Sequence, residues 1–450
     1  MLGDYRIKGR RASEIAADVE QAVGAGLLQP GAALPPLREL ADELGVNPNT
    51  VAAAYRLLRD RGVIETAGRK GSHIRHRPVT TPRDQVRIPV PPGARDLSGG
   101  NPDTALLPPL APAFAVAAAA GDREPVLYGH SPTDPGLLEL ARASFRADGA
   151  PEGELAVCSG SLDAIERVLT TRLRPGDTVA VEDPGWGSLL DLLPALGLRP
   201  APVALDDQGP LPGSLAEALA AGARAVVVTV RAQNPTGAAL TPGRAAELRE
   251  VLAAHPEVVL IEDDHGYGMV DQPYCSLAVG PAGAVTVRRW AVIRSAAKAY
   301  GPDLRLAVMC GERDVVDRVL GRQRLDTGWV SLLLQRAVAE LWRTDAAPVR
   351  KVAAVYRERR DALLAALAGQ GIAAHGESGL NVWVPVPDES GVVAALMQRG
   401  WVVAPGARFR LQAPPGVRIT AAAMRPEEAP RLASDLAAVL GSAAGRSRLT

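Results

Sequence analysis

The sequence predicts an α/β protein with a mostly parallel sheet, preceded by a small helical unit that ends in a hairpin. Three observations support this fold class. From about residue 155 onward, short apolar runs alternate with helical patterns, as they do in βαβ units. Before them, residues 1–77 contain three short helical patterns. Between the two lies a stretch with five prolines, so we expect domains at 1–77 and 98–450 joined by a Pro-rich connector at 78–97.

Composition narrows the classes of protein to consider. The 450 residues carry a formal net charge of zero, so no overall field draws the molecule to nucleic acid or to a membrane. Charge is nevertheless uneven, because residues 1–77 hold 12 basic and 9 acidic side chains. Three cysteines are too few for a disulfide framework, and the charged N-terminus has no apolar signal segment. We therefore expect a cytoplasmic protein without a membrane span.

The first 77 residues predict three helices and a hairpin. One helix is expected over about 15–27, a second from Leu37 to a stop at Gly45, and a third from the cap Asn47 to about Arg61. The hairpin strands are expected at 62–67 and 72–76. The residues expected on the buried helix faces are Ile15, Val19, Val23, Leu27, Leu37, Leu40, Ala41, Leu44, Val51, Tyr55 and Leu58.

This order of elements is typical of a winged helix-turn-helix domain that reads DNA. In such a domain the second helix of the pair enters the major groove with its first residues toward the base edges. Those residues are Asn47, Asn49 and Thr50, and Arg69 and Lys70 at the wing tip are placed to reach phosphates or the minor groove. The alternative is a small helical cap in which the basic residues are only solvated and Asn47 only caps its helix.

The order of motifs resembles the DNA-binding domain of the GntR family of bacterial regulators. The resemblance covers nearly all of 12–75 and rests on Leu34-Pro35-Pro36-Leu37-Arg38-Glu39-Leu40-Ala41, Gly45-Val46-Asn47-Pro48-Asn49-Thr50-Val51, Ala54-Tyr55-Arg56-Leu57-Leu58 and Gly62-Val63-Ile64-Glu65. It implies that double-stranded DNA is a partner, contacted by Arg38, the start of the third helix and the wing.

In the large domain, polar motifs follow the apolar runs that predict strands. Strands are expected at 156–158, 178–182, 225–230, 258–263 and 285–293, with helices such as 162–173 and 242–254 between them. Ligand sites in α/β sheets form outside the carboxyl ends of the strands. The motifs at these ends are therefore the candidate site.

Lys298 is the central candidate. It follows the apolar run Trp290 to Ile293, and burying an ammonium group is costly unless it is paired or neutralised. A desolvated lysine can store its amine as a Schiff base with an aldehyde. Ser295 and Arg305 would suit a phosphate on that aldehyde, as in pyridoxal 5′-phosphate (PLP). The alternative is a surface lysine with no ligand.

Two strand ends carry motifs that suit a flat, phosphate-bearing ligand. Ser159-Gly160-Ser161-Leu162-Asp163 joins a strand to a helix, whose first amides hold phosphate well. Asp183-Pro184-Gly185-Trp186-Gly187 places a tryptophan where it can stack on a ring. The alternatives are an ordinary serine-capped turn and a core tryptophan.

Three further motifs complete the set. In Asn234-Pro235-Thr236-Gly237 the asparagine can donate to a phenolic oxygen. In Glu262-Asp263-Asp264-His265 a carboxylate can keep a pyridine nitrogen protonated, although two carboxylates could instead bind a metal. Arg418 lies in an apolar stretch and can hold a carboxylate bidentately.

Together these motifs resemble the fold-type I aminotransferases across about 98–440. By that resemblance Lys298 forms the Schiff base with PLP, Asp263 pairs with the pyridine nitrogen, and Arg418 binds an amino-acid carboxylate. The resemblance also implies that Tyr128 reaches the phosphate from a partner subunit in a homodimer, expected to be head-to-tail. The cofactor-binding residues it implies are Tyr128, Gly160, Ser161, Leu162, Trp186, Asn234, Asp263, His265, Ser295, Lys298 and Arg305, with no metal.

A GntR-like domain ahead of an aminotransferase-like domain resembles the MocR subfamily of regulators. It implies a DNA-binding regulator that senses PLP or its adduct with an amino acid or amine. The alternative is an active aminotransferase that carries a DNA-binding domain. One departure is that the family usually has a tyrosine after the Asp pair, where this chain has His265, with Tyr267 two residues on.

Overall fold

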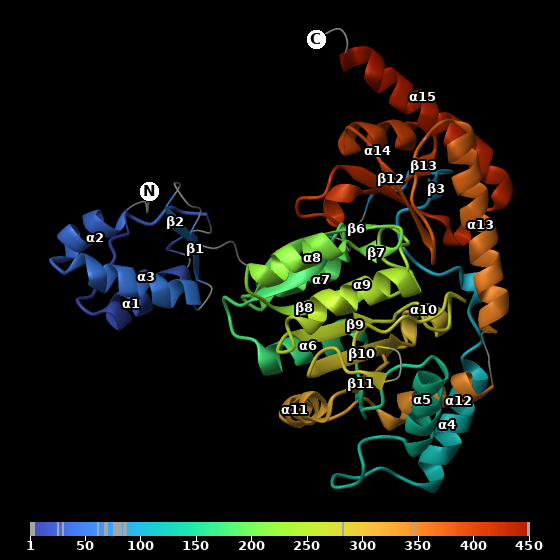
Figure 1. Ribbon diagram of the computed structural model, residues 1–450, viewed down its shortest axis with the longest axis horizontal. Coiled ribbons are helices and arrows are strands. Elements are labelled where there is room, and N and C mark those ends of the chain that lie inside the picture. Colours follow the sequence, from blue (N-terminus) through green and yellow to red (C-terminus); the bar gives the residue numbers. More distant parts are fainter. Residues whose placement is uncertain are drawn as a thin grey trace. The chain divides into compact units, whose positions relative to one another are not determined.

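The structure is a computed structural model that describes residues 5–24, 27–28, 31–60, 63–66, 71–74, 83, 88–280, 283–344 and 348–447. The chain divides into two compact units (Figure 1). The first contains Met1–Thr81 with Leu173–Thr178 and Asp191–Pro200, and the second contains the remaining residues.

Among the N-terminal 81 residues, those that the structure describes form three helices and a two-stranded hairpin. The elements are α1 (Ala12–Gly24), α2 (Leu37–Leu44), α3 (Pro48–Asp60), β1 (Ile64–Thr66) and β2 (Ser72–Ile74), with Ile64 opposite Ile74 in the antiparallel pair. Gly45 ends α2 with a left-handed φ of 62°. The side chain of Asn47 accepts from the backbone N–H of Asn49 at 2.8 Å, which confirms that Asn47 caps α3.

The predicted extent of the first helix is wrong at its C-terminal end. Helix α1 stops at Gly24, and the Leu27 side chain is 59% exposed, whereas Leu28 is 1% exposed and packs in the core. Gly24 and Gly26 are poor helix formers, so the helix ends before the last apolar residue of the periodic pattern, Leu27. Leu37, the first residue of α2, is also more exposed than predicted, at 40%.

The second unit is built on an eight-stranded sheet with the order β4-β11-β10-β9-β8-β5-β6-β7. Strands β8, β9 and β10 are parallel, whereas β11 is antiparallel to both β10 and β4. The strands are β4 (Glu154–Cys158), β5 (Thr178–Asp183), β6 (Arg199–Asp206), β7 (Gly209–Pro210), β8 (Ala223–Thr229), β9 (Val259–Asp263), β10 (Arg289–Ser295) and β11 (Ala307–Gly311). The strand predicted at 285–293 starts later, at Arg289, and includes Ser295. Strands β6, β7 and β11 have no counterpart among the predicted strands.

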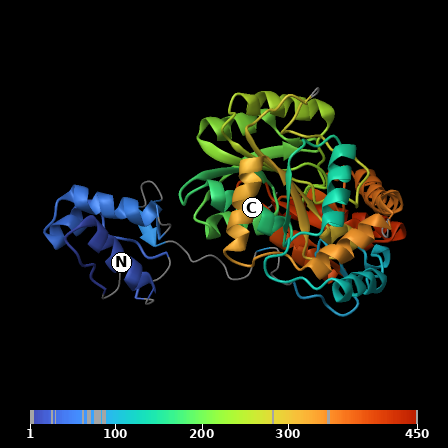
Figure 2. The ribbon, with the colours of Figure 1, turned by 90° about the horizontal axis from the view of Figure 1, so that it is seen from below.

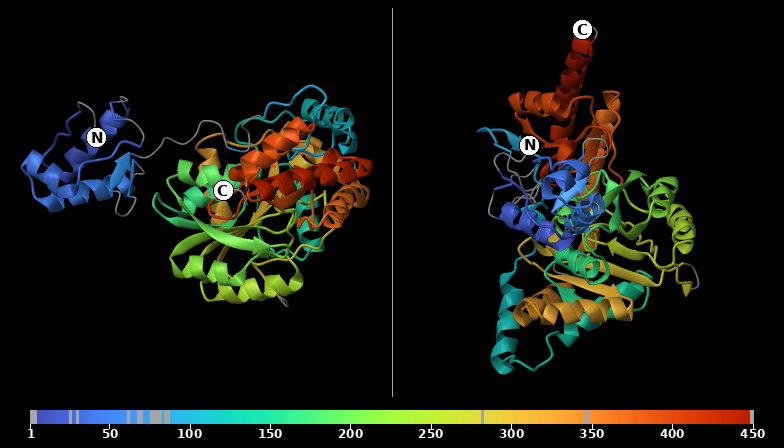
Figure 3. Two further views of the ribbon diagram at one scale, coloured as in Figure 1. Left: turned by 90° about the horizontal axis from the view of Figure 1, so that it is seen from above. Right: turned by 90° about the vertical axis from the view of Figure 1, so that its left-hand side faces the viewer.

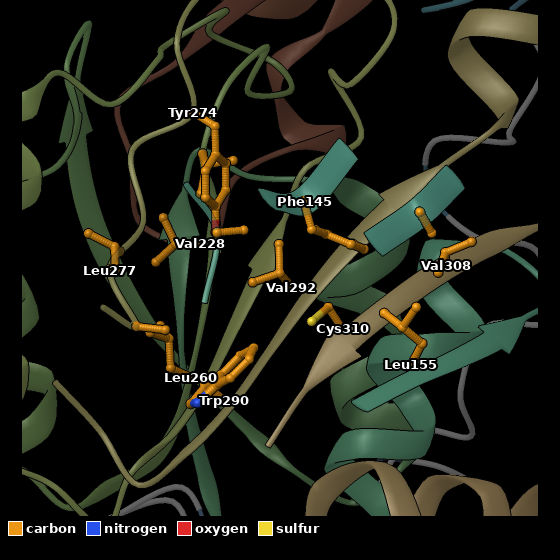
Figure 4. Packing of buried hydrophobic residues seen from close by; sticks show 14 of the residues in the cluster. Phe145, Leu155, Val228, Leu260, Tyr274, Leu277, Trp290, Val292, Val308 and Cys310 are labelled. Carbon is orange, nitrogen blue, oxygen red and sulfur yellow. The ribbon is translucent and has the colours of Figure 1, made fainter. Parts of the chain in front are cut away.

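Helices cover the large sheet on both faces (Figures 2 and 3). They are α4 (Ala111–Arg123), α5 (Pro135–Ala147), α6 (Ser161–Arg172), α7 (Gly187–Ala195), α8 (Pro212–Ala220), α9 (Pro242–Ala253), α10 (Ala297–Tyr300), α11 (Arg313–Arg324) and α12 (Leu332–Arg343). Because both faces are covered, the central strands are near-continuous apolar runs rather than alternating ones. Figure 4 shows Val228, Leu260 and Val292 from neighbouring strands packed with Tyr274 in this core.

A second hydrophobic core belongs to what we call the small lobe. It consists of β3 (Arg95–Asp96), β12 (Asn381–Pro385), β13 (Trp401–Val402), β14 (Ala404–Pro405), β15 (Gly416–Thr420), α13 (Val349–Gly369), α14 (Glu389–Gln398) and α15 (Ala429–Ser447). Strand β3 pairs in parallel with β13, and Leu97, 1% exposed, packs in this core. Residues 95–97 lie within the span predicted as connector, so the connector's last residues are ordered in the small lobe.

Two further observations bear on the expectations from composition. Cys158, Cys275 and Cys310 are free thiols, and burial raises the pKa of Cys310 to about 12. Within the ranges described above, no helix has both the length and the apolar character needed to cross a bilayer.

Candidate functional site

A cavity of about 180 Å³ lies at the carboxyl ends of the central strands of the large sheet. It brings together residues from sequence positions 100 to 381. Its lining residues are Gly100, Ser161, Leu162, Trp186, Ala232, Asn234, Asp263, His265, Met269, Ser295, Ala297, Lys298, Pro302, Arg305, Leu380 and Asn381. The lining therefore contains every residue that we expect to bind a cofactor except Tyr128 and Gly160.

Lys298 lies in the short helix α10, directly after β10. Its ammonium nitrogen Nζ donates to the backbone carbonyl of Gly100 at 2.8 Å. Gly100 belongs to the segment that leads out of β3, so this bond joins the large sheet to a residue next to the small lobe. A lysine held in this way inside a cavity is placed to react with a ligand rather than to extend into solvent.

Asp263 ends β9 and is 3% exposed. Its Oδ2 lies 3.0 Å from Nδ1 of His265, whereas Oδ1 is buried with no partner among the described residues. Leaving a buried carboxylate oxygen unpaired is costly, so Oδ1 is suited to a ligand that brings a proton donor.

His265 stands at the position where the family usually has a tyrosine. Its Nδ1 faces Asp263 Oδ2 and its Nε2 faces the carbonyl oxygen of Ala232, each at 3.0 Å. Both neighbours are acceptors, so the ring holds the Asp263 carboxylate in place. Both ring nitrogens are therefore used within the protein, although the side chain lines the cavity.

Asp264 points away from the cavity. It is fully buried, and its oxygens accept from Nε of Arg231 at 2.6 Å and from Nε of Arg294 at 2.9 Å. The neighbouring carboxylates of Asp263 and Asp264 therefore have different partners and do not converge on one point. This arrangement disfavours the alternative in which the two carboxylates share a metal ion.

One end of the cavity has the character of a phosphate site. Ser161 opens α6, and its buried hydroxyl has no partner among the described residues. Gly160 has a φ of 102°, and a Cβ there would lie 2.7 Å from Nη2 of Arg305, so only glycine lets the guanidinium come this close. A helix start, a hydroxyl and a guanidinium together suit a dianionic phosphate.

Asn234 in the lining and Arg418 behind it are hydrogen-bonded to each other. Nη1 of Arg418 donates to Oδ1 of Asn234 at 2.9 Å, and Nη2 donates to the carbonyl of Ser98 at 2.5 Å. The guanidinium stacks on Phe409, 4.5 Å from the ring centre. Because Oδ1 accepts from Arg418, the amide N–H groups of Asn234 are left to donate. Arg418 itself is 4% exposed and lies behind the lining rather than in it.

Tyr128 does not line the cavity. Its side chain is 93% exposed and packs edge-to-face against Trp329, with ring centres 5.8 Å apart. Its contact with phosphate therefore remains a prediction that requires a second subunit.

Asp183 has a role that sequence reasoning missed. Its carboxylate at the end of β5 accepts from the backbone N–H groups of Leu411, Gln412 and Ala413 at 2.8, 2.6 and 2.8 Å. It thus ties the loop between β14 and β15 to the strand end that carries Trp186. The sequence motif predicts a role only for the tryptophan. The contact of Asp183 with a loop more than 200 residues away could not be predicted, because no pattern near Asp183 in the sequence indicates it.

Glu182 is a buried acid next to the site. Burial raises its pKa to about 7, and the nearby charge of Asp263 adds to the rise. Oε1 accepts from Thr229 N at 3.0 Å and Oε2 from Gln233 Nε2 at 3.2 Å.

We predict that Glu182→Gln removes a pH dependence of stability. Because the folded-state pKa lies above the usual 4.5, Glu182 favours the folded state fully below pH 4.5, and this contribution is lost as pH rises through about 7. The wild type should therefore lose up to about 3 kcal/mol relative to the variant between these values. Denaturant unfolding at pH 5 and pH 8 measures this difference; equal pH slopes for the two proteins would contradict it.

The described N-terminal candidates lie on α2, on α3 or at the cap of α3. Arg38 and Asn49 are exposed, and Thr50 is half-buried at the start of α3. Asn47 is exposed but its Oδ1 serves as the helix cap, so only its amide N–H groups are available to bases. Arg69 and Lys70 lie outside the described residues, so their predicted contacts with DNA remain predictions.

Comparisons with known proteins agree on both domains. Residues 96–436 match the family described as aminotransferase class I and II, and residues 11–74 match the bacterial regulatory proteins of the gntR family. The vitamin B6 salvage pathway transcriptional repressor PtsJ of Salmonella typhimurium is 40% identical over 96% of this chain and 98% of its own. The pyridoxine biosynthesis transcriptional regulator PdxR of Corynebacterium glutamicum is 30% identical over 56% of each chain.

Solved structures share the fold of the large domain. The α-aminoadipate aminotransferase LysN from Thermus thermophilus, complexed with N-(5′-phosphopyridoxyl)-L-leucine, superposes with a TM-score of 0.66. The match covers 78% of this chain and 93% of that enzyme at 21% identity, so the likeness establishes the fold alone.

Proposed function

The chain belongs to the aminotransferase class I and II family and is a transcriptional regulator of the gntR type, and from this premise we propose that PLP is the ligand of its cavity. We propose further that PLP, or its adduct with an amino acid or amine, changes the affinity of the N-terminal domain for DNA. The order of the two domains is that of the MocR subfamily.

The observation that carries this proposal is that Oδ1 of Asp263, which lines the same cavity as Lys298, has no hydrogen-bond partner among the described residues. When bound, PLP supplies an aldehyde that condenses with amines and a ring that accepts electrons. Lys298 provides the amine, and Asp263 Oδ1 keeps a proton on the ring nitrogen while His265 fixes the carboxylate. Lys298 thus suits the aldehyde of PLP, and Asp263 suits the ring nitrogen of the same ligand.

The remaining lining residues bind and orient the ligand under this proposal. Asn234 donates to the phenolic oxygen, because Arg418 occupies its amide oxygen. Trp186 and Leu162 enclose the ring. Gly160, Ser161, Ser295 and Arg305 hold the phosphate. Arg418 would receive an amino-acid carboxylate once it exchanges the Ser98 carbonyl for the ligand.

The regulated genes are proposed to concern vitamin B6. Both regulators reported above bear names that refer to vitamin B6 salvage or pyridoxine biosynthesis. PLP is the active form of that vitamin, so a regulator with a PLP site is suited to sense the product of such genes. The cytoplasm, where DNA and PLP meet, is the proposed location.

A homodimer is proposed because the site has an expected residue outside its cavity. Tyr128 is exposed and lines a surface pocket together with Trp329 and the exposed apolar side chain of Leu333. A head-to-tail partner would cover this surface and bring its own Tyr128 to the phosphate. A monomeric mass in solution would contradict the dimer.

The second candidate is an active aminotransferase, and the full set of Lys298, Asp263, Asn234 and Arg418 favours it. If this is correct, protein-bound PLP should convert to the pyridoxamine form with an amino donor and return with an oxo acid. A sensor instead holds its ligand with a shifted absorption band that persists.

The proposed function is tested by measuring DNA affinity with and without PLP. Duplexes from the region upstream of the protein's own gene, and an unrelated duplex of equal length, are titrated while the visible spectrum reports PLP binding. We expect a PLP-dependent change of affinity for one upstream duplex only. PLP binding with no change in affinity for any upstream duplex would refute the regulatory proposal.

We predict that Asn49→Ala weakens binding to that duplex by about 5- to 150-fold, because a good base contact contributes about 1–3 kcal/mol. Affinity for the unrelated duplex should stay the same, since phosphate contacts are unchanged. Fluorescence anisotropy with both duplexes measures the two affinities. An equal loss on both would show that Asn49 does not read bases.

A further inference from the structure

We infer that Gly100 is a positioning residue: its carbonyl oxygen accepts a hydrogen bond from Lys298 only while the lysine carries a free amino group. Through this bond the chemical state of Lys298 affects the residues at the end of the connector. The inference rests on the proposed function, because it requires PLP to react with Lys298. It concerns the segment Arg95–Gly100, which begins with β3 and ends in the wall of the cavity. Figure 1 shows β3 beside the strands of the small lobe, where the connector ends.

The segment is attached to the small lobe along its whole length. Arg95 N donates to Gly400 O and Leu97 N to Val402 O, both at 2.8 Å, which continues the pairing of β3 with β13. Thr420 N in turn donates to Leu97 O at 2.8 Å, and Gly100 N donates to Thr420 Oγ1 at 3.0 Å. The segment therefore moves with the small lobe and not independently of it.

Lys298 contacts this segment from the large sheet. The bond from its Nζ to Gly100 O, at 2.8 Å, crosses from α10 to a residue anchored on the small lobe. Arg418 makes the parallel link, because it holds both the Ser98 carbonyl and Asn234. Two polar contacts at the cavity thus join the large sheet to the segment that ends the connector.

Glycine is required at position 100 for this geometry. Its φ is +64°, a conformation that favours glycine, and a Cβ there would lie 2.9 Å from Nη2 and 3.0 Å from Nη1 of Arg418. Any side chain would therefore displace either the backbone carbonyl that Lys298 uses or the guanidinium. Gly99 has no such restriction, since its Cβ would meet only the side chain of Asn101, at 3.1 Å.

Reaction at Lys298 changes what Gly100 can accept. The ammonium first loses a proton; the amine then forms a C=N bond with the aldehyde carbon, and the aldehyde oxygen leaves as water with the two remaining amine hydrogens. The nitrogen is then bound to the ligand and has at most one proton, which is directed by the ligand's plane. The bond to Gly100 O is lost, and the small lobe with β3 is released from the large sheet at this point.

The test compares two ligands that differ only in the reacting group. PLP has the aldehyde, whereas pyridoxine 5′-phosphate has an alcohol there and cannot condense with Lys298. Hydrogen–deuterium exchange of the full-length protein follows the amides of Leu411, Gln412 and Ala413, whose hydrogen bonds to Asp183 cross from the small lobe to the large sheet. We expect PLP to raise their exchange about tenfold and pyridoxine 5′-phosphate to leave it unchanged while it occupies the cavity.

Gly100→Ala and the control Gly99→Ala test the residue itself. In Gly100→Ala these amides should already exchange at the PLP-bound rate without ligand, whereas Gly99→Ala should keep the wild-type difference. Equal exchange with both ligands in the wild type would overturn the inference, and this comparison stands even if Gly100→Ala does not fold. If PLP gives no absorption band with the wild type, the proposed function fails instead.

Discussion

Replacement of Lys298 by alanine is expected to abolish the effect of PLP on DNA binding while leaving DNA binding itself in place. Among the described residues that line the cavity, Lys298 alone carries an amine that can form a covalent link with an aldehyde. Coupling between two sites typically amounts to about 5- to 150-fold in affinity. We expect that factor in the wild type and a factor near one in Lys298→Ala, measured by anisotropy over a range of PLP concentrations.

The lysine content of the sequence makes this prediction easy to control. The chain contains four lysines, Lys8, Lys70, Lys298 and Lys351, so a borohydride-reduced link to PLP can be assigned to one peptide by mass spectrometry. Lys351→Ala is the matched control, because Lys351 is exposed on α13 and does not line the cavity. A PLP response that survives in Lys298→Ala would mean that occupancy alone, without the covalent link, sets the affinity for DNA.

Much of the large sheet and of the site could be predicted from sequence for one physical reason. The carboxyl ends of parallel strands meet at one edge of a sheet, so motifs that follow separate apolar runs converge without further information. Ser161, Asn234, Asp263 and Lys298 lie far apart in sequence and line one cavity. The third helix and its cap were predictable because Asn47 and Pro48 act locally.

What could not be predicted depends on contacts between distant segments. The small lobe combines residues 95–97 with strands after residue 380, and no pattern in the sequence near either segment predicts that they pair. The same holds for Lys298 with Gly100, and for Asp183 with the loop at 411–413. His265 shows a different limit: its sequence position suggests a contact with the ligand, but both ring nitrogens bind within the protein.

Asp263→Asn is expected to weaken PLP binding by about 10- to 100-fold. A hydrogen bond to a charged group contributes about 1.5–3 kcal/mol, and here the acceptor is a buried carboxylate oxygen with no other partner among the described residues. The amide has no charge to stabilise a protonated ring nitrogen, so the absorption band of bound PLP should shift as well. Titration followed by absorption gives both quantities.

The matched control for Asp263→Asn is Asp314→Asn, which removes a carboxylate on the exposed side of α11 that pairs with Arg172 and Arg318. It should leave both the affinity and the spectrum unchanged. Excess PLP also raises the free energy of unfolding of a protein that binds it, which provides an independent check. If Asp263→Asn binds PLP a hundredfold more weakly, the same PLP concentration should stabilise it by about 2.7 kcal/mol less than the wild type. If Asp263→Asn bound PLP with wild-type affinity and spectrum, the unpaired oxygen would not face the ring nitrogen, and the orientation proposed for the ligand would have to be reversed.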